Sequence, residues 1–333
     1  MTIPSTMKAA VSQGYGPPQS VRVETVPVPR PKPGELLVRV RATTVNRTDC
    51  GYRGASPALI RVISGLRRPT SPILGTEFAG EVVGLGEGVT NYALGDRICG
   101  YCEGTFGAHA QYMTISEERL IVPIPEDRNF EQAAPSTEGS HYALASLRWS
   151  NLKAGDDVLV YGATGAIGSA AVQLAKSLGF NVTAVCATPH VELVERLGAD
   201  RVIDYLKEDF TRDRQRYHLV FDAVGKSSFR RCRRLLKPRG VYSSSDLGFM
   251  WHVPLFALIT SLFRGRRVLF FTPRRDPEGI RWLKGLIASG EFTPVIDRTY
   301  SLDDIVEAYH YVETGQKVGN VVVRVADEDP TGT

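Results

Sequence analysis

The chain has 333 residues, of which 43% are apolar and 23% charged, with a formal net charge of +4. This length can form two domains with separate cores, and the composition is that of an ordinary globular protein. The mild positive charge does not indicate a nucleic-acid partner. The first residues, M-T-I-P-S-T-M-K, lack the apolar core of a secretory signal.

The most apolar stretch, 247–263, contains His252 and Pro254 and is too short to predict a membrane span. We expect a buried or interface helix there, with membrane contact as the weaker alternative and no stable membrane insertion. Five cysteines, an odd number, do not suggest a disulfide framework and favour a cytoplasmic location. Cys99 and Cys102 form a C-x-x-C pair, but no second pair of ligands for a structural zinc lies nearby in the sequence.

Residues 8 to about 130 have the pattern of short strands separated by Pro- and Gly-rich turns. The predicted strands are 21–26, 35–41, 81–85, 96–101, 110–115 and 120–122. Their alternating apolar and β-branched residues predict a partly open, all-β barrel. Nothing in this region has the pattern of a βαβ unit.

A helix predicted at 131–147 leads to the stretch D-V-L-V-Y-G-A-T-G-A-I-G at 157–168. An apolar strand here turns through Gly162, Gly165 and Gly168 into an Ala/Val/Leu-rich helix. Such a turn directs backbone N–H groups and the positive end of a helix at one point, which suits a pyrophosphate. The flanking strand and helix favour a dinucleotide site over a plain turn.

Strands and helices then alternate, which predicts a doubly wound parallel sheet and an α/β fold. The strands are expected at 181–187, 201–204, 219–223, 240–244 and 267–271, and the helices at 191–197, 228–236 and 277–288. Ser301 and Asp304 open a further helix that runs to Gly315, and 319–325 reads as a strand. We expect this strand to return to the barrel. The predicted domains are therefore 1–133 with 291–333, and 134–290.

At this point the sequence resembles the medium-chain dehydrogenase/reductase superfamily, and within it the zinc-free quinone oxidoreductase, or zeta-crystallin-like, branch. The matching stretches are Pro33–Asp49, Leu74–Val83, the glycine stretch, Leu197–Tyr205 and Val220–Gly225. The resemblance implies a discontinuous GroES-like catalytic domain and a Rossmann-type dinucleotide-binding domain. Zinc-dependent members carry a Cys at the position of Asn46 and a His at that of Thr76; Glu77 remains, but alone it makes a poor zinc site. No metal is expected.

The cofactor is expected to be NADPH, with NADH the less favoured alternative. An NAD site places a carboxylate after the second strand, and the window Val185–His190 contains no acid. Thr188 offers a hydroxyl, and the resemblance implies that Tyr205 lies against the adenine or donates to the phosphate; ordinary loop polarity and packing is the alternative for both. The predicted cofactor-binding residues are Gly162, Thr164, Gly165, Ala166, Ile167, Gly168, Thr188, Tyr205 and Asn320.

Without a metal, hydrogen-bond donors must stabilise negative charge that develops on the substrate oxygen. The resemblance implies that Asn46 and Tyr52, in the predicted loop N-R-T-D-C-G-Y-R-G, face the nicotinamide and the substrate. His141 is the third catalytic candidate because its unperturbed pKa lets it donate a proton, although a satisfied helix histidine is the alternative. Asp49 either orients a neighbour or caps the loop.

The leading hypothesis is an NADPH-dependent, zinc-independent reductase that transfers hydride to quinones or α,β-unsaturated carbonyl compounds. Two alternatives stay open: an NAD(P)-dependent alcohol dehydrogenase, and a non-catalytic NADP(H)-binding protein of crystallin type. The partner is a small electrophilic acceptor. The apolar edge at 267–271 leads us to expect a homodimer, because relatives pair such edges.

Overall fold

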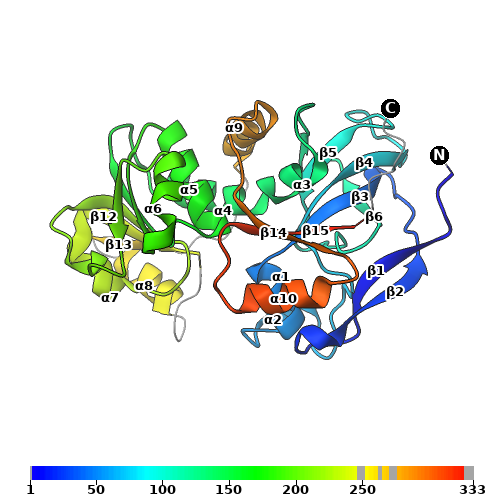
Figure 1. Cartoon of the computed structure of the whole chain (residues 1–333), viewed down its shortest axis with the longest axis horizontal. Helices are drawn as coiled ribbons and strands as arrows, with labels where there is room; N and C mark the ends of the chain where they lie inside the picture. Colours follow the sequence, from blue (N-terminus) through cyan, green and yellow to red (C-terminus); the bar gives the residue numbers. More distant parts are fainter. Residues whose placement is uncertain (1, 246–251, 262–264, 270–275, 326–333) are drawn as a thin grey trace. The chain divides into compact units, whose positions relative to one another are not determined.

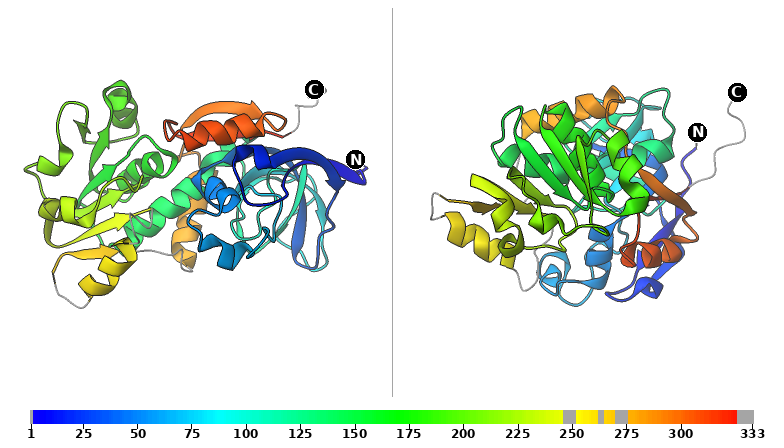
Figure 2. Two further views of the ribbon diagram at one scale, coloured as in Figure 1. Left: turned by 90° about the horizontal axis from the view of Figure 1, so that it is seen from below. Right: turned by 60° about the vertical axis from the view of Figure 1, so that its left-hand side comes forward.

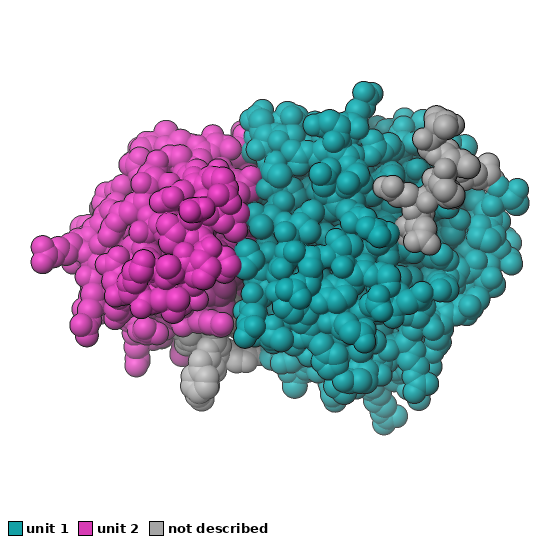
Figure 3. Space-filling model, in the orientation of Figure 1, with its two compact units in different colours: residues 1–138, 284–333 teal, residues 139–283 magenta. Residues whose placement is uncertain are grey.

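The computed structural model describes residues 2–245, 252–261, 265–269 and 276–325 (Figure 1). The apolar stretch 247–263 and the predicted strand 267–271 therefore lie partly outside the described residues. The chain divides into two compact units, residues 1–138 with 284–333, and residues 139–283 (Figure 3). No helix among the described residues combines the length and the apolarity that crossing a bilayer requires.

The first unit is built on a seven-stranded sheet in the order β14-β15-β3-β4-β5-β7, with β6 paired to β3. Its strands are β3 (Glu35–Val45), β4 (Glu77–Leu85), β5 (Arg97–Tyr101), β6 (Tyr112–Ser116), β7 (Leu120–Pro123), β14 (Ile296–Ser301) and β15 (Asn320–Arg324). β15 runs antiparallel to β3, with Val321 opposite Val45. The expected return of the C-terminal strand to the N-terminal barrel is confirmed.

A separate hairpin and several short helices complete this unit. The hairpin joins β1 (Thr6–Ser12) to β2 (Val21–Pro27), and the helices are α1 (Arg47–Gly54), α2 (Ile60–Ser64), α3 (Phe130–Ala133) and α10 (Ile305–Glu313). The buried face of α10 repeats at helical spacing and packs into the same core as β3, β4 and β15. In Figure 1 the N-terminal strands are blue, and β14, α10 and β15 are orange to red.

The second unit holds a six-stranded, fully parallel sheet in the order β10-β9-β8-β11-β12-β13. Its strands are β8 (Asp157–Tyr161), β9 (Asn181–Cys186), β10 (Arg201–Asp204), β11 (Tyr217–Asp222), β12 (Leu236–Ser244) and β13 (Arg267–Leu269). Its helices are α5 (Ala166–Ser177), α6 (Val191–Arg196), α7 (Phe229–Cys232) and α8 (His252–Ser261). Helices lie on both faces of the sheet in Figures 1 and 2, so the doubly wound prediction is confirmed.

Two helices occur at the unit boundaries: α4 (Glu138–Trp149) and α9 (Pro277–Ala288). The helix predicted at 131–147 was wrong in its continuity, because Pro135 breaks it into α3, a 3-10 turn and α4. Asn46 to Gly54 was predicted as a loop and is instead the N-cap residue and body of α1. The predicted helix at 228–236 is also shorter, since α7 gives way to a 3-10 turn at Arg233–Leu235.

Candidate active site

The glycine turn after β8 has the backbone geometry that its sequence predicts. Gly162 has a φ of +81°, and a Cβ built on it would lie 2.5 Å from Val224 Cγ1. A Cβ on Gly168 would lie 2.0 Å from the Gly162 carbonyl oxygen. A side chain at either position would therefore collide with its surroundings, because the turn is sharp and α5 packs directly on it.

Gly165 differs from the other two glycines. It is the N-cap of α5 with extended backbone, its nearest contact to a built Cβ is 3.7 Å, and no side chain caps the helix. Ala166 and Ile167 form the first turn of α5, and Thr164 lies in the turn before it. The helix thus presents backbone N–H groups without a competing side-chain cap, which is the arrangement that receives a phosphate.

The second predicted cofactor region lies where β9 and β10 end. The Thr188 hydroxyl donates to Asp204 Oδ2 over 2.5 Å. This contact lowers the pKa of the Asp204 carboxyl, and Lys207 Nζ lies 3.3 Å from the same oxygen. The window 185–190 itself contains no acid, but β10 brings the Asp204 carboxylate to Thr188, a partner that the window does not show.

Tyr205 follows Asp204 directly and is exposed. It lines a surface hollow of about 380 Å³ in the second unit. Lys207, Phe210 and Arg231 line the same hollow, and Phe210 stacks on Tyr161 with ring centroids 4.6 Å apart. The hollow therefore offers aromatic faces near Tyr205, with two basic and two acidic side chains (Glu208 and Asp209) in its lining.

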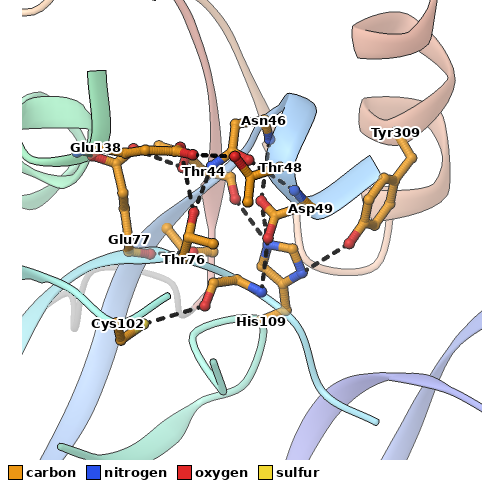
Figure 4. Close-up of polar contacts among 12 residues, drawn as sticks. Thr44, Asn46, Thr48, Asp49, Thr76, Glu77, Cys102, His109, Glu138 and Tyr309 are labelled. Atoms are coloured by element: carbon orange, nitrogen blue, oxygen red, sulfur yellow. Dashed lines mark hydrogen bonds and ion pairs between the residues drawn. The ribbon is translucent and has the colours of Figure 1, made fainter. Parts of the chain in front are cut away.

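In the first unit, Asn46 stands at the head of α1 within a buried polar network (Figure 4). Its Oδ1 accepts from the backbone N–H of Asp49 over 2.9 Å, and the Asp49 carboxylate accepts from the Asn46 backbone N–H in return. Asn46 Nδ2 donates to Thr76 Oγ1 over 2.6 Å. The side chain thus has a structural role as a helix cap, whatever else its amide does.

Two buried glutamates lie beside this cap. Glu77 Oε1 accepts from the backbone N–H groups of Thr137 and Glu138 and from the Thr137 hydroxyl, and its Oε2 accepts from Thr44 Oγ1. Glu138 accepts from two hydroxyls of the described residues, Thr48 Oγ1 at 2.6 Å and Thr76 Oγ1 at 3.4 Å.

Burial raises the pKa of both carboxyls. The neighbouring negative charge of Glu77 raises the pKa of Glu138 further. Four donors, two of them peptide N–H groups, stabilise a charge on Glu77 better than two hydroxyls stabilise one on Glu138. Two neighbouring buried carboxylates do not both ionise readily, and the donors favour the negative charge on Glu77, so Glu138 is the carboxyl whose pKa is raised further.

Asp49 connects the network to a buried histidine. Its Oδ1 accepts from the backbone N–H of Gly75, and its Oδ2 lies 3.8 Å from His109 Nε2. His109 Nε2 lies 2.8 Å from the Thr44 carbonyl oxygen, and Tyr309 approaches Nδ1 at 3.3 Å. Burial lowers the pKa of His109 to about 4, so the ring is neutral and donates from Nε2. Of the two expectations for Asp49, it fulfils the capping one.

The other predicted site residues occupy varied positions. Tyr52, on α1, is half-buried and meets Phe106 edge to face at 4.7 Å; burial raises the pKa of its phenol. His141, on α4, has its pKa lowered by burial. Asn320 is buried at the start of β15 and donates from Nδ2 to the Val295 carbonyl oxygen. Among the predicted catalytic residues, Asn46 and Tyr52 share helix α1 in the first unit, and His141 belongs to the second.

The residues at the position of the zinc site in related enzymes do not fit that metal. The Asn46 amide donates to Thr76, and neither offers the thiolate or imidazole that zinc prefers. Glu77 has both carboxylate oxygens engaged by protein donors. Within the described part of the chain, no three His, Cys, Asp or Glu side chains are grouped as a metal ion would require.

Sequence reasoning missed Glu138, Thr48 and His109. These residues lie far apart in the chain, and no spacing rule connects them. The one available signal was the density of polar residues in T-T-V-N-R-T-D and in G-T-E, two stretches that were selected for their resemblance alone.

A parallel sheet with a glycine turn after its first strand, together with a mainly antiparallel barrel, defines an α/β protein of Rossmann-type plus GroES-like architecture. Comparison with known proteins agrees. Residues 32–126 match the family model described as alcohol dehydrogenase GroES-like domain, and residues 197–323 match that described as zinc-binding dehydrogenase.

The chain is 30% identical over 97% of its length to 2-methylene-furan-3-one reductase of Solanum lycopersicum, covering 80% of that protein. It is 30% identical to the quinone oxidoreductase of Pseudomonas aeruginosa, over 93% of this chain and 97% of that one. The solved quinone oxidoreductase from Coxiella burnetii superimposes with a TM-score of 0.84 at 27% identity, over 96% of this chain and all of that one. The chain belongs to the medium-chain dehydrogenase/reductase superfamily, in its branch of NAD(P)H-dependent quinone oxidoreductases and alkenal/one reductases.

Proposed function

We propose that this protein is an NADPH-dependent, zinc-independent oxidoreductase that transfers hydride to quinones or α,β-unsaturated carbonyl compounds. The observation that carries the proposal is the uncapped glycine turn at the start of α5, in a chain that matches reductases of such acceptors over nearly its whole length. Bound NADPH would supply the hydride, and the substrate takes up that hydride and one proton.

The chain's own residues supply binding and hydrogen-bond donors. The first turn of α5 would hold the pyrophosphate through its backbone N–H groups. Tyr52 is the candidate donor to the acceptor oxygen, because burial raises the pKa of its phenol and keeps it protonated at neutral pH. Asn46 has a second N–H on the amide that already binds Thr76. Such a donor contributes roughly 3 kcal/mol to stabilising developing charge in other enzymes.

Zinc independence follows from the donor set and not from the metal content of the structure. Reduction of a conjugated acceptor needs charge stabilisation at oxygen, which the neutral donors above can give. Oxidation of an alcohol also needs removal of a poorly acidic proton, and the amide and hydroxyl at positions 46 and 76 do not lower its pKa as a zinc ion would. This favours the reductase over the alcohol dehydrogenase alternative.

The preference for NADPH has a specific test at Asp204. The carboxylate beside Thr188 would repel a 2′-phosphate. Lys207 and Arg231 of the nearby hollow would attract it, and Glu208 and Asp209 of the same hollow would oppose them. Asp204→Asn should therefore tighten NADPH binding severalfold, because it removes a negative charge beside the 2′-phosphate. NADH, which lacks the phosphate, is the internal control. An equal change for both nucleotides would place the phosphate elsewhere.

Turnover is tested by mixing NADPH-loaded protein with a panel of quinones and enones and following the loss of NADPH absorbance. Oxidation in proportion to acceptor supports the reductase. Protein that binds NADPH tightly, melts at a higher temperature with it and reduces no acceptor would instead be the crystallin-type binder.

A further inference from the structure

The surface of the first unit carries an apolar ridge on and around α2. Four large apolar side chains within eight residues are exposed: Leu59 by 53%, Val62 by 66%, Ile63 by 71% and Leu66 by 73%. Single exposed apolar residues are common on protein surfaces, but a contiguous group marks a binding surface. We call these four residues the α2 ridge.

An ordinary surface helix turns its apolar side chains toward the core, whereas α2 exposes its apolar side chains and buries a serine. The buried side chain of α2 is Ser64, whose hydroxyl donates to the Ile60 carbonyl oxygen and meets the Tyr15 hydroxyl at 2.8 Å. Tyr15 also donates to the Gly65 carbonyl oxygen over 2.6 Å. Polar contacts thus fasten the inner side of the segment to the unit, and the apolar side chains point outward from an anchored backbone.

The charged residues of the segment that carries the α2 ridge are all basic. Arg61, Arg67 and Arg68 are all exposed, and no Asp or Glu occurs between Cys50 and Thr76. Arg61 is held with its guanidinium 5.1 Å from the Tyr15 ring centroid. Outward apolar residues flanked by arginines are the pattern of a segment that lies in a membrane interface, with its apolar side chains among the acyl chains and its cations at anionic headgroups.

A second copy of this chain is a poorer occupant. A two-fold contact through the α2 ridge would place the same three arginines of each copy against one another, and the segment supplies no acid to neutralise them. An anionic bilayer offers both the apolar layer and the opposite charge.

We propose that the α2 ridge docks this protein reversibly onto the surface of membranes that contain anionic phospholipids. The contact is peripheral, in keeping with the expectation of no stable insertion. It goes beyond the proposed function, since neither nucleotide binding nor turnover is part of it, and so either proposal can fail alone. It would place the enzyme at a phase in which apolar quinones and long-chain enones accumulate.

The full-length protein is tested by co-sedimentation with vesicles of phosphatidylcholine alone and of phosphatidylcholine with phosphatidylglycerol. We expect binding to the anionic vesicles that weakens as salt is added, and little binding to phosphatidylcholine. Arg67→Gln with Arg68→Gln should reduce binding by tenfold or more, since each basic residue near such a surface contributes about 1 kcal/mol. Val62→Ser with Ile63→Ser should reduce it comparably by removing inserted apolar area.

Matched controls separate the α2 ridge from general charge and hydrophobicity. Leu94→Gln removes an apolar side chain that is 65% exposed in the same unit, and Arg22→Gln with Arg30→Gln removes two exposed arginines there. Both controls should bind like the unchanged protein. Absence of binding to anionic vesicles, or equal loss in ridge and control variants, would overturn the proposal. So would a dimer, seen by light scattering, that Val62→Ser with Ile63→Ser dissolves.

Discussion

At the residue scale, the buried pair Glu77 and Glu138 decides how the first unit responds to pH. Glu138 keeps its proton in the fold, because Glu77 beside it takes the backbone donors and holds the negative charge. In the unfolded chain, a glutamate loses its proton near pH 4.3. Folding therefore takes up a proton between that pH and the raised pKa of Glu138.

This predicts a stability that falls with rising pH. A raised pKa contributes stability that is fully present below the unfolded value and is lost as pH increases through the folded value. The negative charges of Asp49 and Glu103 also raise the pKa of Glu138, and Lys317 interacts electrostatically with the Glu138 carboxyl. The glutamine in Glu138→Gln cannot ionise, so this variant lacks that pH dependence. Relative to the variant, the unchanged protein should lose up to about 1.4 kcal/mol of unfolding free energy for each pH unit above pH 4.3.

The measurement is urea unfolding of both proteins from pH 5 to pH 8, with Glu307→Gln on the exposed side of α10 as the charge-matched control. Parallel curves for the unchanged protein and Glu138→Gln would show that Glu138 ionises in the fold as it does in the unfolded chain.

The glycine turn gives a second prediction at this scale, because Gly165 has room for a side chain and Gly168 does not. Gly168→Ala should lower the unfolding free energy by about 2 kcal/mol or more, because its Cβ meets a backbone oxygen that cannot move aside. Gly165→Ala should leave stability within about 0.5 kcal/mol, because its Cβ has room and its φ is −71°. If the turn holds the pyrophosphate, Gly165→Ala should still weaken NADPH binding at least tenfold.

Thermal melting and nucleotide titration of the two variants provide the comparison. A stable Gly165→Ala protein with unchanged NADPH affinity would remove the turn from the binding site. A fully stable Gly168→Ala protein would contradict the close packing of α5 on the turn.

At the element scale, the sequence predicted most strands and helices of both units, but it did not predict β1, β14 or α2. The parallel strands β8 to β12 are apolar runs next to glycines, so local pattern suffices to find them. β3 continues four residues beyond its predicted end at Arg41, through A-T-T-V. The Thr43 and Thr44 hydroxyls donate to the Glu77 carbonyl and carboxylate oxygens across the sheet, which extends the strand to Val45. The sequence around Thr43 and Thr44 does not show that Glu77, more than thirty residues away, is their partner.

Helix α1 illustrates the same limit for the candidate site. Its sequence has low helix propensity, with two glycines, a threonine and an aspartate in eight residues, so a loop was the reasonable expectation. The Asn46–Asp49 capping box and the contact of Asp49 with Gly75 stabilise the turn instead. Residues chosen by resemblance were therefore found, while the tertiary contacts that hold them were not predictable.

This helix yields a prediction that separates capping from catalysis. Asn46→Ala removes the cap and should cost about 1 kcal/mol of unfolding free energy, and Asn46→Ser, which retains an oxygen acceptor, should recover most of it. If the amide also serves the substrate, both variants should lose kcat alike, because serine cannot reproduce the N–H donor. Chemical unfolding and steady-state kinetics test the two effects independently. Activity that follows stability in both variants would leave Asn46 with a structural role only.

At the scale of the whole molecule, the chain folds as two units with separate cores, and the second ends its described sheet at β13. β13 pairs with β12 on one side, with Val268 opposite Tyr242. An apolar edge strand of this kind is a template for a second copy. The exposed apolar face of the adjacent α8, with Leu255 and Leu258, extends that edge.

We therefore expect a homodimer that pairs β13 edges about a two-fold axis. Light scattering over a hundredfold range of concentration should give twice the chain mass. Leu269→Lys places on this edge the residue with which natural proteins block strand pairing, and should yield a monomer that still binds NADPH. Leu94→Lys, on a loop of the other unit, should remain a dimer. A monomeric unchanged protein would refute the dimer itself. A dimer that survives Leu269→Lys would show that the interface does not include β13. At a two-fold β13 interface the two lysines would face each other, which adds charge repulsion and the cost of burying an ammonium group.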